Sequence, residues 1–196
     1  MWSVMEPTAL HEWQFTEEEK KTLLELALTT IEHGVERGIF KSVASHFPGQ
    51  LSESGASFVT LRRQGQLRGC IGQLEASMPL AQDVCKHAYA AAFQDPRFSP
   101  LQANELADLD IHISVLSPKV PVECESENQL LTQLQPGQDG VVLRAGYRQG
   151  TFLPDVWRSL PEPKEFLTQL KLKAGIEPTS WPENIEVWRY RTTSIP

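Results

Sequence analysis

The sequence is poor in cysteine and lacks any long apolar run. Its 196 residues include three cysteines, Cys70, Cys85 and Cys124, which lie far apart and form no C-x-x-C pair. A few scattered cysteines argue against a disulfide framework and a structural zinc site, and fit a reducing compartment. No run of about 18 apolar residues exists, so we expect no transmembrane helix. The first residues lack a basic segment followed by an apolar core, so we expect no signal peptide and a cytoplasmic protein.

Basic residues are fewer than acidic ones: the chain has 18 Lys and Arg and 25 Asp and Glu, which gives a formal net charge of −7. With no RNP-type or helix-turn-helix signal either, the sequence does not favour a nucleic-acid partner. It has no G-x-x-x-x-G-K-S/T loop and no C-x-x-x-C-x-x-C motif, so it is predicted to be neither a P-loop NTPase nor a radical S-adenosylmethionine (SAM) enzyme. Residues 61–100 are locally basic, with five basic and three acidic side chains, and could meet an anion if these side chains converge.

Helical and strand patterns are both present, without a strict β-α-β rhythm. Thr16 followed by three glutamates predicts a capped helix from residue 17 onward. Gln64-Gly65 is a turn candidate between two strands at 56–63 and 66–74, which predicts a hairpin. Further helices are predicted at 78–94, 125–135 and 161–174, a turn at 147–150, and strands at 110–118, 140–145 and 185–193. The pattern predicts an α+β fold with a mixed or mostly antiparallel sheet and helices packed on it.

The length predicts one domain, or two interleaved lobes. We place this domain at residues 15–194, after an N-terminal arm over residues 1–14. Trp2, Met5 and Trp13 are the apolar residues that could attach the arm to the domain.

The most unusual segment is 67–72, Leu-Arg-Gly-Cys-Ile-Gly, which places two glycines beside a cysteine inside a predicted strand. Glycine within a strand often marks a bulge or a close approach of the backbone to a ligand. With a period of two, Arg68, Cys70 and Gly72 share one face of the strand. An arginine near the thiol would favour the thiolate, which makes Cys70 a candidate nucleophile. The alternative is a small buried cysteine in a tightly packed strand.

Further segments of the chain can be compared, in order, with known families. They are 58–61, 67–72, 91–93, 95–98, 100–101, 113–118, 139–140, 151–154 and 171–175. Together they cover roughly residues 17–192, and the ordered set is much more specific than segment 67–72 alone. In this order they resemble the AMMECR-one domain family, whose bacterial branch is called AmmeMemoRadiSam system protein A.

The resemblance implies an α+β fold of two interleaved lobes, with segment 67–72 lining a cleft. It also implies a Memo-like protein and a radical SAM protein as partners. Two positions depart from the family pattern: Asp155 stands where Gln is usual, and His112 stands where an acidic residue is frequent.

The candidate ligand-binding residues come from segment 67–72 and from the other matching segments. Asp95 and Arg97 are either a charged pair at the cleft or a helix stop with a surface salt bridge. His112 is either a general base or a half-exposed strand residue. No acidic partner is evident for a Ser-His-Asp triad with Ser114. The full set is Arg68, Gly69, Gly72, Asp95, Arg97, His112, Ser114 and Thr151.

Two functions follow as hypotheses. In the first, the protein binds or transforms a small polar or anionic ligand, recognised in part by arginine, without a metal or cofactor. In the second, it is a non-catalytic adaptor for the Memo-like and radical SAM proteins, and the glycines serve tight packing. The adaptor hypothesis predicts an exposed apolar patch.

Overall fold

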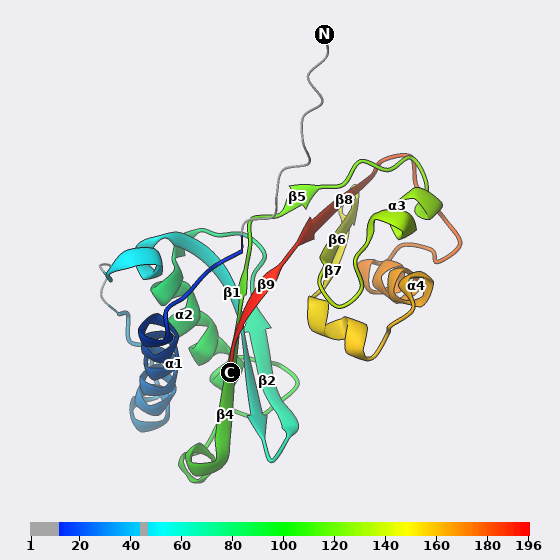
Figure 1. Ribbon diagram of the computed structural model, residues 1–196. Coiled ribbons are helices and arrows are strands. Elements are labelled where there is room, and N and C mark those ends of the chain that lie inside the picture. Colours follow the sequence, from blue (N-terminus) through cyan, green and yellow to red (C-terminus); the bar gives the residue numbers. More distant parts are fainter. Residues whose placement is uncertain (1–11, 44–46) are drawn as a thin grey trace. The chain divides into compact units, whose positions relative to one another are not determined.

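The computed structural model describes residues 12–43 and 47–196, and the chain divides into two compact units (Figure 1). Among the described residues, the large unit comprises Trp13–Leu116 and Thr193–Pro196, and the small unit comprises Ser117–Thr192. Of the predicted arm, residues 1–11, and with them Trp2 and Met5, lie outside the described residues. Trp13 is buried, and its indole Nε1 donates a hydrogen bond to the Leu116 carbonyl at 2.8 Å.

The large unit is a five-stranded sheet with two long helices on one face (Figure 1). The strands lie in the order β2-β1-β4-β9, and β3 pairs with the beginning of β1. The elements are α1 (Glu17–Arg37), η1 (Gly49–Ser52), β1 (Ser54–Arg63), β2 (Gln66–Gly72), β3 (Met78–Pro79), α2 (Leu80–Phe93), η2 (Ala103–Asp108), β4 (Leu109–Leu116) and β9 (Thr192–Ile195).

Local sequence explains the ends of α1. Thr16 accepts the backbone N–H of Glu19 while the Glu19 side chain accepts the N–H of Thr16, which closes a capping box. Gly38 ends the helix in the left-handed conformation at φ 70°. The helix then buries its apolar stripe against α2 and the sheet. The resulting core includes Leu23, Ala27, Ile31, Val59, Leu61, Val84, Ala88, Ala91, Ile113 and Val115.

The small unit has a four-stranded sheet in the order β5-β8-β6-β7, with antiparallel pairing throughout these strands. In its core the Trp157 and Phe166 rings stack with their centroids 3.7 Å apart. The elements are β5 (Val120–Pro121), α3 (Glu127–Gln133), β6 (Gly140–Ala145), β7 (Arg148–Phe152), η3 (Pro154–Arg158), α4 (Pro163–Ala174) and β8 (Ile185–Tyr190).

The α+β prediction is confirmed, with local differences at three elements. Met78 and Pro79 pair with β1 as a short strand, so α2 begins at Leu80 rather than at residue 78. The turn predicted at 147–150 is shorter, because Arg148 already pairs with Ala145 and leaves a two-residue hairpin loop. The strand predicted at 185–193 is divided into β8 and β9. Within the described residues, every helix is too short or too polar to cross a bilayer.

Candidate functional site

The two glycines of segment 67–72 allow β2 to pack closely against its neighbours. A Cβ atom on Gly69 would lie 2.1 Å from the Ala91 carbonyl oxygen of α2. A Cβ atom on Gly72 would lie 2.4 Å from the Phe58 ring and 2.4 Å from the Ser57 carbonyl oxygen. Both distances are far shorter than a van der Waals contact, so packing within the protein is enough to explain glycine at both positions.

Cys70 lies on the face of β2 opposite that of Gly69, in a row of polar side chains that crosses the sheet. Thr60 of β1 is the cross-strand partner of both Cys70 and His112. Residues directly opposite each other project from the same face of a sheet. The Cys70 Sγ lies 3.3 Å from the Thr60 hydroxyl, and the His112 Nε2 lies 2.9 Å from the Ser194 hydroxyl. We call Cys70, Thr60, His112 and Ser194 the polar row.

The polar row lies on the face opposite the helices. The neighbours of Thr60 and His112 along their strands, such as Val59 and Ile113, point into the helix-covered core. Each member of the polar row is at least partly exposed. The row therefore presents a thiol, two hydroxyls and an imidazole from four adjacent strands.

The backbone of Cys70 is held by the charged pair that follows α2. Its N–H donates to Asp95 Oδ2 at 2.9 Å, and its carbonyl accepts from the Arg97 guanidinium at 3.2 Å. Arg97 also donates to Asp95 through Nε at 3.0 Å and through a terminal nitrogen at 2.7 Å. The Arg97 hydrogen bond, assisted by the N–H of Cys70, holds the pKa of the buried Asp95 carboxyl well below its usual range. Asp95 and Arg97 therefore position Cys70.

Arg68 is engaged with a carboxylate. Its guanidinium donates to both Glu105 oxygens, at 2.8 and 3.0 Å, and to the Ser99 carbonyl at 2.9 Å. The hydrogen bond from Arg68 is the main reason that the pKa of Glu105 falls to about 2. The charge of Arg68 is therefore compensated by Glu105.

The remaining predicted residues have structural partners. Ser114 faces Phe58 across β1 and β4 and is buried. Thr151 belongs to the small unit, where its hydroxyl donates to the Val141 carbonyl at 2.9 Å and lies 2.9 Å from the Tyr190 hydroxyl. These contacts bring neither residue into the polar row.

The other two thiols differ from Cys70 in their surroundings. Burial raises the pKa of Cys85, which sits on α2 in the core. Burial also raises the pKa of Cys124 in the small unit. Over residues 12–43 and 47–196, no group of three His, Cys, Asp or Glu side chains is placed to hold a metal ion.

Sequence reasoning missed Thr60 and Ser194. Thr60 stands in segment 58–61, one of the matching segments, but its relation to Cys70 depends on the β1–β2 register. Ser194 lies 82 positions from His112 in the sequence, and no local signal joins them.

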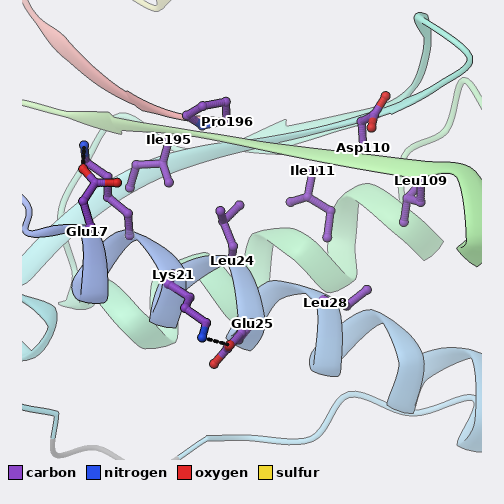
Figure 2. Close-up of a pocket in the computed structure, with 11 residues that line it drawn as sticks. Glu17, Lys21, Leu24, Glu25, Leu28, Leu109, Asp110, Ile111, Ile195 and Pro196 are labelled. Atoms are coloured by element: carbon purple, nitrogen blue, oxygen red, sulfur yellow. Dashed lines mark hydrogen bonds and ion pairs between the residues drawn. The ribbon is translucent and has the colours of Figure 1, made fainter.

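A cavity of about 520 Å³ lies elsewhere, between α1 and the start of β4 (Figure 2). Leu24, Leu28 and Ile111 form part of its apolar lining, and charged side chains of α1 stand at its edge. No predicted site residue lines this cavity.

This chain is similar over most of its length to several known proteins and to one protein family. The chain is 34% identical over 181 residues to a protein of Methanothermobacter thermautotrophicus, covering 89% of this chain and 92% of that one. It is 38% identical over 167 residues to a protein of Thermotoga maritima, covering 84% and 91%. The crystal structure of an uncharacterised Pyrococcus horikoshii protein superposes with a TM-score of 0.85 at 30% identity, covering 93% of each chain. The AMMECR1 family model matches residues 24–195, and the chain therefore belongs to the AMMECR1 family.

Proposed function

We propose that this AMMECR1-family protein binds a small polar ligand at the polar row, with the Cys70 thiol in contact with it. The observation that carries the proposal is the fixed position of Cys70: its peptide N–H and carbonyl are held by Asp95 and Arg97, while its Sγ shares an accessible face with Thr60. A cysteine that served only to fill the core would be buried among apolar side chains, whereas Cys70 is partly exposed and lies beside a hydroxyl.

The charges near Cys70 favour a polar ligand over a strongly anionic one. Arg68 is paired with Glu105, and Arg97 is paired with Asp95. The Arg97 side chain is nevertheless 53% exposed, so it can still donate to a ligand oxygen at the edge of β2. A neutral ligand with several hydrogen-bonding groups fits these surroundings best.

The polar row supports binding more directly than base-assisted nucleophilic attack. Cys70 and His112 stand on opposite sides of Thr60. Because adjacent strands lie about 4.8 Å apart, the backbones of Cys70 and His112 are separated by about 10 Å. A Cys70 nucleophile would therefore have to pass its proton to a basic group of the ligand or to solvent.

The partners and compartment belong to the same proposal. Family membership supports a cytoplasmic protein that works with a Memo-like protein and a radical SAM protein. The adaptor alternative is supported by one observation, the exposed apolar side chains that follow α1, Ile39 at 61% and Phe40 at 41%. An adaptor would bind both partners as tightly when Cys70 is replaced by Ser.

The test is the rate at which iodoacetamide alkylates each thiol of the native protein across pH, followed by mass spectrometry. Cys85 and Cys124 are internal controls, because burial raises the pKa of both. We expect Cys70 to react fastest, and Thr60→Val to change its rate without changing those of the controls. A Cys70 that stays inert until denaturant is added would reduce segment 67–72 to a packing motif and overturn the proposal.

A further inference from the structure

A second cavity, of about 450 Å³, lies in the large unit where α1 and α2 both end. Gly34, Val35 and Gly38 line it from α1, and Tyr89 and Phe93 line it from α2. The segment after α2 supplies the remaining wall, Pro100, Leu101, Gln102 and Ala103. None of these residues belongs to the polar row.

The sequence builds this cavity through one close approach and one helix end. Gly34 lets the Phe93 ring lie directly against α1, since a Cβ atom there would fall 2.3 Å from the ring. Gly38 ends α1 in the left-handed conformation. The N–H of Leu101 donates to the Ala92 carbonyl at 2.9 Å, which folds the following segment back over the end of α2.

Two independent features of this cavity favour a cation, although its lining includes no carboxylate. The last carbonyl groups of a helix carry a partial negative charge, and α1 and α2 both end here. The faces of aromatic rings are also negative, and the Tyr89 and Phe93 rings lie side by side with centroids 4.9 Å apart. The lining residues include no Lys, Arg or His, and Arg37, in the last turn of α1, is not among them.

Neighbouring contacts hold the Tyr89 ring in place. Its hydroxyl donates to the Gly38 carbonyl at 3.4 Å, and Phe40 meets the ring in a T-shaped contact at 5.5 Å. Both Tyr89 and Phe93 remain half-buried, so part of each ring is accessible from the cavity. Carbonyl ends and aromatic faces together recognise a weakly hydrated organic cation better than a compact metal ion.

We propose that this cavity binds the alkylammonium group of a small molecule. The ligand would place its cationic head against Tyr89 and Phe93 and near the helix ends, with apolar contact to Val35 and Leu101. The site is independent of the proposed function at Cys70.

The probe for the test is choline, compared with 3,3-dimethyl-1-butanol, its neutral carbon analogue of similar shape. Binding is followed by ¹H–¹⁵N NMR titration of the full chain, with the amides of Gly34 and Gly38 as reporters. We expect choline to shift these amides and to bind about ten-fold more tightly than the neutral analogue. Equal affinity of the two probes, or no shift with choline, would overturn the proposal.

Four variants test the location of the site. Tyr89→Leu removes an aromatic face and should weaken choline binding about ten-fold. Tyr89→Phe keeps the face, loses only the hydroxyl bond to Gly38, and should bind choline like the unaltered protein. Tyr147→Leu is the matched control, because Tyr147 is 92% exposed in the small unit. Choline binding that survives Tyr89→Leu in a folded protein would contradict the assignment, and Cys70→Ser should leave choline binding unchanged.

Discussion

The carboxylate of Asp95 accepts the backbone N–H of Cys70 at 2.9 Å, 25 positions away in the sequence. Arg97 completes the arrangement by donating to the carbonyl of the same residue. Cys70 belongs to the edge strand β2, so its N–H and carbonyl groups meet side chains where an inner strand would meet another strand. The Asp95–Arg97 pair thus fixes the thiol and also covers an otherwise open sheet edge.

This relationship predicts that Asp95→Asn destabilises the large unit. The side chain is 1% exposed, and the amide would leave Arg97 with a weaker partner and place an N–H₂ group beside the donors. We expect a loss of about 2 kcal/mol in the free energy of unfolding, measured by urea denaturation. Asp155→Asn, at a carboxylate that is 61% exposed, should change it by less than about 0.5 kcal/mol. Equal effects of the two substitutions would contradict the positioning role.

The same carboxylates predict how stability depends on pH. Arg68 lowers the pKa of Glu105 from 4.5 to about 2, and Arg97 lowers that of Asp95 below its ordinary 3.8. Because folding lowers both values, their stabilising contribution is complete above the unfolded pKa values and is lost as pH falls through the folded ones. Unfolding free energies measured between pH 6 and pH 2, at steps of about one unit, should fall mainly below about pH 4.5. Glu105→Gln should flatten this decline, and an unchanged slope would show that other groups control it.

The close packing of β2 on α2 predicts that Gly69 is needed for stability, whatever the role of the Cys70 thiol. Gly69→Ala would place a Cβ atom 2.1 Å from the Ala91 carbonyl, and backbone cannot move aside cheaply as a flexible side chain could. We expect a loss of at least about 2 kcal/mol in the free energy of unfolding. Leu67→Ala, at a neighbouring position that is 37% exposed, is the control and should cost less. A stable Gly69→Ala protein would mean that β2 can shift away from α2.

Sequence patterns predict correctly those parts of the fold that depend on contacts between residues close together in the chain. The cap at Thr16 and the hairpin at Gln64-Gly65 both lie within a few residues of the contacts they form. The candidate site depends instead on the register between strands and on contacts between residues far apart in the sequence. Arg68 and Glu105 are 37 positions apart, so their pairing, which compensates the charge expected to activate the thiol, could not be read from segment 67–72. Thr60 could be placed beside Cys70 only once the β1–β2 register was known.

Lys171 gives the last prediction, in the small unit. Its side chain is fully buried, and its ammonium donates to Glu127 and to the carbonyls of Pro178 and Ser180. It therefore ties α4 to the start of α3 and to the segment that follows α4. Lys171→Ala would remove the charge partner of Glu127 and leave both carbonyls without this donor, so we expect a loss of about 3 kcal/mol in the free energy of unfolding.

The matched control for Lys171 is Lys164→Ala, at an exposed position on the same helix. This substitution should change stability by less than about 0.5 kcal/mol. Hydrogen exchange adds a local readout: in Lys171→Ala, amides of residues 176–181 should lose protection while those of the large unit keep theirs. If the two lysine variants unfold at the same denaturant concentration, the buried ammonium does not hold this segment. If protection is lost equally in both units, Lys171 acts on global stability and not on the segment it contacts.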